Sequence, residues 1–321
     1  MTMTKHTIKR RLSKSHIRKW GFRLIHFVLV FGICFIILYP LIVKFCTAFK
    51  SPNDLLDKTV IYVPREFTLT AIQNVFRGMN YPQALLNTLG ISLLVSGLAV
   101  ASCTLVGYGF GRFQFPLKRF WFAMVILTMI IPPQVVFLPT YLHFRNFDIL
   151  GLLGLFGLEN GVSLINNPGS FAVLGITAMG FKNGLYIYMI QQFFRGLPKE
   201  LEEAAHVDGA GHFRTFFRIF LPSAGSIIGT VFLFSFIWQW TDTYYTQFFM
   251  PNAELLSNAL LNIGYQITSM GTNSTLSAAS PAALSQINNI GCLLVIIPLL
   301  VLYAFTQKIF VEGVERSGIV G

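Results

Sequence analysis

Long stretches without a charged residue recur along this chain and alternate with short polar, mostly basic segments. A charged side chain at the centre of a bilayer costs about 2.5 to 3.5 kcal/mol, and about 20 apolar residues suffice for a helix to cross it. Each stretch therefore predicts a transmembrane helix. The predicted spans are residues 24–43, 85–111, 120–144, 171–194, 219–241 and 287–309. The pattern favours an all-α integral membrane protein with six transmembrane helices.

Two of these stretches, the fourth and the sixth, have irregularities. The fourth is interrupted by Lys182 and Asn183, and the sixth contains Pro298, which is expected to bend or loosen its helix. Residues 255–307 carry no charge at all, but their first part is rich in Ser, Thr, Asn and Gly, so the span is placed at 287–309.

Composition agrees with this pattern. The chain has 54% hydrophobic and 12% charged residues, and its mean hydropathy is +0.61, which excludes an ordinary soluble domain. The net charge of +11 resides mostly in short loops beside apolar stretches. Membrane topology and anionic lipid headgroups account for it there, so nucleic acid is not an expected partner.

The distribution of basic residues predicts the orientation in the membrane. If the N-terminus is cytoplasmic, 17 of the 24 Lys and Arg residues fall in cytoplasmic segments, as the positive-inside rule requires. Both termini are then cytoplasmic. The first apolar run is about 20 residues long and lacks a small-residue cleavage pattern, so it is expected to remain as a span.

The segment between the fourth and fifth spans predicts two short helices. Pro198 suits the first turn of a helix, and Glu200, Glu202 and Glu203 would place negative charge at its positive end. Gly209 and Gly211 would end it in the left-handed conformation. A second helix would follow, with Phe213, Phe216, Phe217 and Phe220 at near-helical spacing and Arg214 and Arg218 on another face. The plain alternative is a surface helix that binds no partner.

The spacing of small residues in this segment resembles a known motif. The motif begins with the run Glu203-Ala204-Ala205. Three residues separate Ala205 from Gly209, and nine separate Gly209 from Ile219. This spacing resembles the EAA loop of type I ABC importer permeases. The wider chain is similar to the carbohydrate-uptake group of these permeases, which includes the second permease of the maltose system. The matching stretches are Phe49-Lys50, Asn87-Thr88-Leu89, Gly107-Tyr108, Arg112-Phe113, Phe115-Pro116, Ile131-Pro132-Pro133-Gln134 and the tail 313–321.

This resemblance implies a permease fold with cytoplasmic coupling helices in a bacterial inner membrane. The helix of the EAA loop would dock in a cleft of a cytoplasmic ATPase, whose closure would drive the spans between inward-open and outward-open states. The implied coupling residues are Glu203, Ala204, Ala205, Asp208, Gly209, Ile219, Leu221 and Pro222. The implied segments are 1–23 (basic and cytoplasmic), 24–84 (first span and external loop), 85–309 (permease core, EAA loop 198–222) and 310–321 (tail).

The implied partners are a second homologous permease, two ABC ATPase subunits and an extracytoplasmic sugar-binding protein, and the implied cargo is a sugar or oligosaccharide. The chain departs from the group in two places. Ser223 to Ser226 stand where a further proline is frequent, and Ile319 stands where a lysine is common, which leaves contacts of the tail with the ATPase open.

Chemistry by this chain itself is not expected. No Gly-rich loop with Lys-Ser/Thr is present to bind phosphates, so a partner would bind and hydrolyse ATP with Mg, and no catalytic residue, cofactor or metal site is predicted. His206 and His212 are expected to be loop residues. The four cysteines, Cys34, Cys46, Cys103 and Cys292, have no paired spacing and are interpreted as small packing residues.

Substrate contacts are predicted where polar and aromatic residues interrupt the spans. In the fifth span these are Trp238, Gln239, Trp240 and Asp242, because aromatic faces stack on sugars while polar groups bind hydroxyls. An interfacial aromatic belt is the alternative. Lys182, Asn183 and Tyr186 form the second group, with a snorkelling lysine and ordinary helix packing as alternatives. Two other function classes are considered. An ion-coupled secondary transporter has little support, because the spans offer few ionisable residues beyond Lys182 and Asp242. A membrane-embedded enzyme would need a nucleophile-base pair or metal ligands within the spans, and the sequence offers none.

Overall fold

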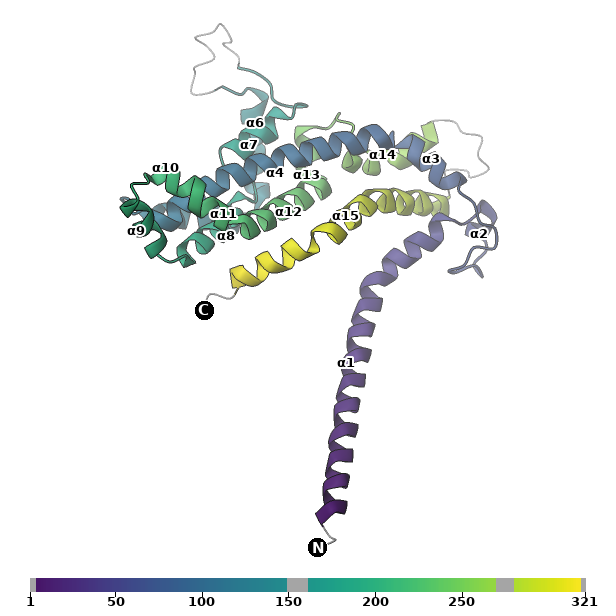
Figure 1. Cartoon of the computed structure of the whole chain (residues 1–321). Coiled ribbons are helices and arrows are strands. Elements are labelled where there is room, and N and C mark those ends of the chain that lie inside the picture. The colour runs from purple at the N-terminus through teal and green to yellow at the C-terminus, as the bar shows by residue number, and fades with distance from the viewer. Residues whose placement is uncertain (1–3, 149–160, 270–279, 319–321) are drawn as a thin grey trace. The chain divides into compact units, whose positions relative to one another are not determined.

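The computed structural model describes residues 4–148, 161–269 and 280–318 (Figure 1). Within these residues the chain is helical, with two isolated antiparallel bridges, Lys50 with Phe67 and Phe147 with Val162, and no strand. The all-α prediction is confirmed. The helices are α1 (Thr4–Ala48), α2 (Pro52–Leu56), α3 (Thr70–Gly78), α4 (Tyr81–Arg112), α5 (Lys118–Ile130), α6 (Pro133–Arg145), α7 (Gly169–Ile176), α8 (Asn183–Gly196), α9 (Glu200–Val207), α10 (His212–Thr215), the π-helical turn η2 (Phe216–Phe220), α11 (Leu221–Ser223), α12 (Gly225–Thr241), α13 (Tyr244–Phe249), α14 (Leu256–Ser269) and α15 (Pro281–Gly318).

Among the residues that the structure describes, three helices are long and apolar enough to cross a membrane as single elements: Lys19–Ala48, Tyr81–Arg112 and Pro281–Lys308. They contain the first and second predicted spans and all but the last residue of the sixth. Two further candidates are bent pairs, α5 with α6 and the segment His212–Ser223 with α12. The third, fourth and fifth predicted spans are therefore not single straight helices.

The third predicted span bends by 100° between α5 and α6. Ile131 and Pro132 are extended, with ψ angles of 124° and 128°. A residue that precedes proline is disfavoured in the α conformation, and both of these residues precede one. The stretch 120–144 thus forms two helices rather than one, because the Pro132-Pro133 pair ends the first.

The fourth and fifth predicted spans are also interrupted. Residues 177–182 separate α7 from α8, and Ala178 there has a positive φ of 57°. The fifth bends by 73° between the segment that contains Ile219 and α12. Pro222 cannot donate the α-helical bond to residue 218, and the wider π-helical turn η2 lies just before it.

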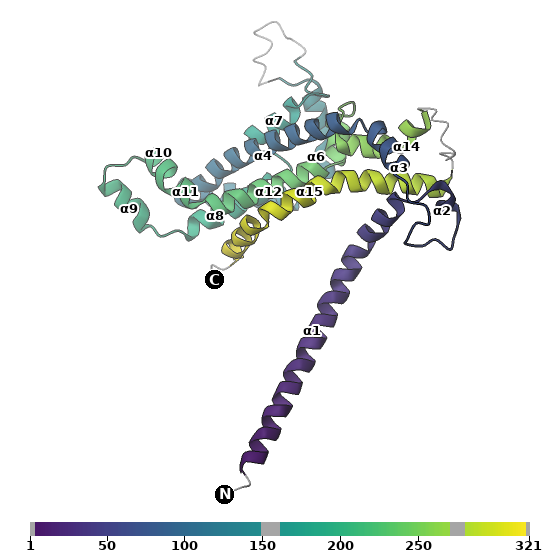
Figure 2. The same ribbon diagram turned by 45° about the vertical axis from the view of Figure 1, so that its right-hand side comes forward.

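The chain divides into two compact units, residues 1–75 with 267–293 and residues 76–266 with 294–321. In the second unit α4 lies beside α8 and α12 (Figures 1 and 2). Glycines allow the close approach of α4 to α8: a Cβ at Gly107 would lie 2.7 Å from Cγ2 of Ile190, and one at Gly111 would lie 2.8 Å from Cβ of Phe194.

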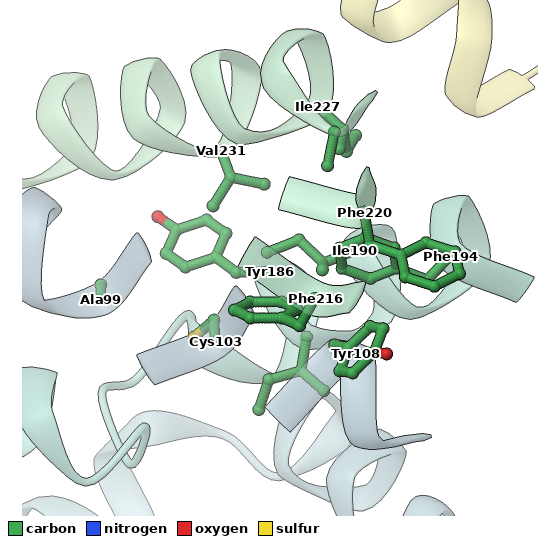
Figure 3. Close-up of a cluster of buried hydrophobic side chains, with 12 residues drawn as sticks. Ala99, Cys103, Tyr108, Tyr186, Ile190, Phe194, Phe216, Phe220, Ile227 and Val231 are labelled. Carbon is green, nitrogen blue, oxygen red and sulfur yellow. The ribbon is translucent and has the colours of Figure 1, made fainter. Parts of the chain in front are cut away.

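The core of the second unit is an aromatic and aliphatic cluster. Tyr108 of α4 lies against Phe194 of α8 and against Phe216 and Phe220 of η2, with ring centroids 4.7 to 5.4 Å apart. Figure 3 shows these side chains converging with Ile227 and Val231 of α12. Cys103, buried in the same cluster, is a packing residue as the sequence predicted.

Pro298 lies inside α15, which continues through it. Because proline has no N–H, the carbonyl of Leu294 has no donor four residues ahead. The hydroxyl of Tyr81 donates to that carbonyl at 3.0 Å, and the indole of Trp240 donates to the next one, on Val295, at 3.1 Å. The carbonyl that Pro298 leaves without its helical donor, and the next one, thus accept hydrogen bonds from α4 and α12.

In the first unit an ordered loop follows α1. The ammonium group of the buried Lys50 donates to the carbonyls of Val60 at 2.7 Å and Ile61 at 3.0 Å. The buried carboxylate of Asp54 accepts from the backbone N–H groups of Arg65 and Glu66, at 2.9 and 3.1 Å. These bonds hold residues 50–66 as a folded segment.

Candidate functional site

Helix α9 has local signals at both ends. Three glutamates, Glu200, Glu202 and Glu203, occupy its first turn, where negative charge stabilises a helix. At its other end Gly209 has φ of 75°, its N–H donates to the carbonyl of His206, and the N–H of Ala210 donates to that of Ala205. This pair of bonds is the Schellman motif. The left-handed Gly209 was predicted correctly.

Two details of the prediction for this segment were wrong. Gly211 is extended, with φ of −75° and ψ of 166°, and it is the N-cap of α10 rather than part of the turn that ends α9. Pro198 lies before the N-cap residue, Lys199, and not in the first helical turn. Because the helix begins at Glu200 rather than at Pro198, α9 has the eight residues Glu200–Val207.

The faces of α9 differ in exposure. Ala205 is buried, with 3% of its surface exposed, and it faces the protein. Glu203, Ala204, Asp208 and Gly209 are exposed. The predicted coupling residues of α9 therefore divide into one anchoring alanine and an exposed surface of two acids and two small residues.

Arg112, the last residue of α4, fixes α9 to the body of the second unit. Its side chain is only 3% exposed and forms an ion pair with Glu202, with Nη2 and Oε2 3.0 Å apart. The guanidinium also donates to the carbonyls of Leu197 at 2.9 Å and Pro198 at 3.2 Å, and its Cζ lies 4.7 Å above the ring of Phe220. One side chain thus holds the start of α9, the turn before it and η2.

The segment after α9 is anchored by alternate aromatic residues. Phe216 and Phe220 are buried in the core cluster, whereas Phe213 and Phe217 are 82% and 58% exposed. Among the other predicted coupling residues, Ile219 and Leu221 are half-buried and Pro222 is exposed. In both views α9 and α10 lie beyond the ends of α8 and α11 (Figures 1 and 2).

A groove of about 1000 Å³ lies beside α9. Its lining is rich in basic side chains, and Glu202, Glu203 and His206 border it. The basic residues are Arg112, Lys118, Arg119, Arg195 and Lys199. An excess of positive charge in a concave surface attracts acidic groups of a partner or of lipid.

The predicted substrate residues meet at a second place. A hollow of about 100 Å³ is lined by Tyr245 and by six of the predicted residues, namely Lys182, Asn183, Tyr186, Trp238, Gln239 and Asp242. The ammonium of Lys182 lies 4.4 Å from the ring centroid of Trp238, and the buried amide nitrogen of Asn183 has no hydrogen-bond partner among the described residues. The structure thus brings together residues from α8 and α12 that are more than 50 positions apart in sequence.

Two of the predicted substrate residues have contacts that serve the fold. Trp240 is 2% exposed, does not line the hollow, and donates to the backbone of α15. Asp242 lines the hollow, and its carboxylate accepts from the N–H of Thr246 at 2.7 Å and from its hydroxyl at 2.8 Å. It therefore also stabilises the start of α13.

Sequence reasoning missed two features of this region. Arg112 and Glu202 lie 90 positions apart, and the pattern of the sequence offered no signal for their pairing. Glu202 and His206 are four apart on one helix, which is a readable signal for contact, and the turn at Gly209 then brings His212 to them. The ring centroids of the two histidines are 5.0 Å apart.

Comparison with known proteins gives consistent matches. A relative covering 99% of both chains, at 27% identity over 326 aligned positions, is the "Osmoprotective compounds uptake permease protein GgtD" of Synechocystis. The "Maltodextrin transport system permease protein MalD" of Streptococcus pneumoniae is 26% identical, with 97% of each chain covered. The "Arabinooligosaccharides transport system permease protein AraQ" of Halalkalibacterium halodurans is 25% identical, covering 90% of this chain and 93% of its own.

Among solved structures, a chain of a bacterial ABC transporter for import of the acidic polysaccharide alginate matches with a TM-score of 0.64. It is 19% identical and the match covers 91% of this chain and 97% of that one, so it establishes the fold. A family model matches residues 103–316, from the middle of α4 almost to the end of α15. The chain is a multi-pass membrane protein, and it belongs to the family of inner membrane components of binding-protein-dependent transport systems.

Proposed function

We propose that this chain is a permease subunit of an ATP-driven importer and forms half of the transmembrane pathway for a sugar or oligosaccharide. Relatives named for maltodextrin and arabinooligosaccharide transport support this cargo class. The chain would pair with a second, homologous permease, receive its cargo from an extracytoplasmic binding protein and be driven by two ABC ATPase subunits.

One observation supports the coupling role. Helix α9 presents an exposed surface of acidic and small residues, while its first turn is held to the protein by Arg112. Glu203 and Ala204 are exposed, and the neighbouring Glu202 is paired with the buried Arg112. A helix that transmits a movement of its partner needs both properties. The partner must bind one face of the helix, and the opposite face must stay fixed to the rest of the protein. The small side chains of Ala204 and Gly209 would allow close approach of the ATPase.

The positive-inside distribution supports cytoplasmic termini and a cytoplasmic α9 in a bacterial inner membrane. ATP and Mg would be bound and hydrolysed by the ATPase partners, and this chain would contribute no catalytic group. The basic groove beside α9 offers a second contact for an acidic ATPase surface.

We also propose that the hollow at Lys182, Asn183, Trp238 and Gln239 is one wall of the cargo pathway. Its volume of about 100 Å³ is smaller than the roughly 300 to 1000 Å³ typical of a ligand pocket. A pathway between two permeases would be completed by the second subunit. Tyr186 lines the hollow while 2% exposed, so it supports the wall from the core.

Purification of the tagged chain from membranes in mild detergent, followed by identification of the proteins that accompany it, tests this proposal. The wild type should bring down a second permease and an ATPase. Glu203→Lys should retain the second permease and lose the ATPase, because it reverses a charge on the exposed face of α9 alone. Recovery of the chain by itself, together with uptake in vesicles driven by a proton or sodium gradient, would instead indicate a secondary transporter.

A further inference from the structure

Glu202, His206 and His212 form a cluster beside the coupling surface. Their ligand atoms all lie within 4.8 Å of one another. Glu202 and His206 are one turn apart on α9, and His212 is the first residue of α10. We propose that this cluster is a binding site for a zinc-class divalent cation, with two imidazole nitrogens and one carboxylate oxygen as ligands.

The hydrogen bonds around His206 prepare it as a ligand. Its Nδ1 lies 3.0 Å from the carbonyl oxygen of Ala210, which can only accept, so Nδ1 carries the proton and donates it. The lone pair of the neutral ring is then on Nε2, which lies 4.0 Å from Oε1 of Glu202. A backbone carbonyl that fixes the tautomer in this way is the usual outer partner of a metal-bound histidine.

Glu202 is oriented by a comparable outer contact. Arg112 pairs with its Oε2, with Nε at 3.1 Å and Nη2 at 3.0 Å, while Oε1 faces His206. The carboxylate therefore has one oxygen engaged by the protein and one available to a cation. Ligating carboxylates are themselves commonly hydrogen-bonded in this manner.

The distances suit a small cation after modest side-chain movement. Zinc binds His nitrogen and carboxylate oxygen at about 2.0 to 2.2 Å, which places tetrahedral ligand atoms roughly 3.4 Å apart. The ligand atoms, which lie within 4.8 Å of one another, must approach by at most about 1.4 Å, and His206 is 40% exposed, so its ring has room to move. Three protein ligands leave the fourth position open to water, a geometry that zinc readily accepts.

An ion at this place would connect two elements across a turn. Glu202 and His206 belong to α9, and His212 follows the left-handed Gly209. Cation binding would thus stiffen residues 208–211, which join the exposed face of α9 to α10. This inference concerns binding alone and does not depend on the proposed transport role.

The test uses the full-length chain, purified through a tag without histidines, and titrates it with Co²⁺ followed by Zn²⁺. We expect one Co²⁺ per chain, with the visible absorption of a tetrahedral site, and displacement by Zn²⁺. His206→Gln and His212→Gln should each weaken binding more than tenfold, since even outer partners of a metal site are worth about 10- to 100-fold. His143→Gln, at a histidine on α6 outside the cluster, should bind as the wild type does.

Hydrogen exchange gives an independent readout of the same site. Zn²⁺ should slow amide exchange in residues 208–211 of the wild type and leave it unchanged in His212→Gln. Absence of saturable Co²⁺ and Zn²⁺ binding to the wild type, or binding that survives both cluster variants, would overturn the proposal. The two variants replace exposed rings and leave the Arg112–Glu202 pair intact. Both variants should therefore fold, so weaker metal binding can be attributed to the lost ligand.

Discussion

Replacing Arg112 by methionine should release α9 from the rest of the protein. Methionine keeps an unbranched apolar stem against the ring of Phe220 but removes every donor of the guanidinium. The variant loses the ion pair with Glu202 and the bonds to the carbonyls of Leu197 and Pro198. Because the lost contacts all lie at the start of α9 and the turn before it, their loss is expected to act locally.

The magnitude follows from these contacts. A hydrogen bond to a charged group contributes about 1.5 to 3 kcal/mol and an ordinary one about 0.5 to 1.5 kcal/mol. Glu202 is 22% exposed, so screening by water reduces the contribution of the ion pair below that of a fully buried pair. A local loss on the order of 3 kcal/mol remains, which corresponds to roughly a 150-fold larger open population of α9.

Amide hydrogen exchange of residues 200–207 measures this opening directly. Lys118→Met is the matched control, since Lys118 lines the same groove but donates to the carbonyl of Phe113 and not to α9. Arg112→Met should accelerate exchange across α9, up to the limit set by the unfolded segment, and reduce uptake, while the control leaves exchange unchanged. Exchange within about twofold of the wild type in Arg112→Met would refute the anchoring role.

Other substitutions test the packing, the turn and the hollow. Gly107→Ala should lower the thermal denaturation midpoint, because overpacking costs about 1 to 3 kcal/mol. Gly109→Ala should not, because among the described residues the added Cβ would meet no atom within 4 Å apart from the adjoining backbone of its own helix. Equal midpoints would contradict the close contact of α4 with α8. Gly209→Val places a β-branched residue in the left-handed region, which costs about 1 to 2 kcal/mol, and should reduce uptake at normal membrane abundance. Gly209→Asn should retain uptake. Full uptake by the valine variant would argue against the role of the turn. Trp238→Ala should raise the KM for uptake. Trp121→Ala should leave the KM unchanged, because this tryptophan of α5 does not line the hollow. An unaltered KM in both variants would show that Trp238 does not line the pathway.

The sequence predicted the helical class and the long apolar elements well, because a membrane imposes a strong and simple pattern. It also predicted the left-handed conformation of Gly209, since a glycine that follows a short helix is a local signal for the end of that helix. Local signals were present for two of the breaks as well. Pro132-Pro133 and Pro222 lie at the bends of the third and fifth predicted spans, and these prolines were not used to predict a bend there.

Contacts between residues that are distant in the sequence could not be predicted from a single sequence. The pairing of Arg112 with Glu202 depends on how α4 and α9 fold together, and neither residue's neighbours encode it. The same holds for Trp240, whose aromatic and polar surroundings in sequence suggested a substrate contact. Its indole instead donates to a carbonyl of α15 next to the one that Pro298 leaves free.

Site-specific photocross-linking would show whether the exposed face of α9 binds an ATPase. A photoreactive residue replaces Ala204, which is exposed on α9, and in a control chain it replaces Val63, which is 80% exposed and far from α9 in sequence. We expect a cross-link from position 204 to an ATPase subunit in intact membranes and none from position 63. No ATPase adduct at position 204, in membranes that take up the substrate normally, would contradict it.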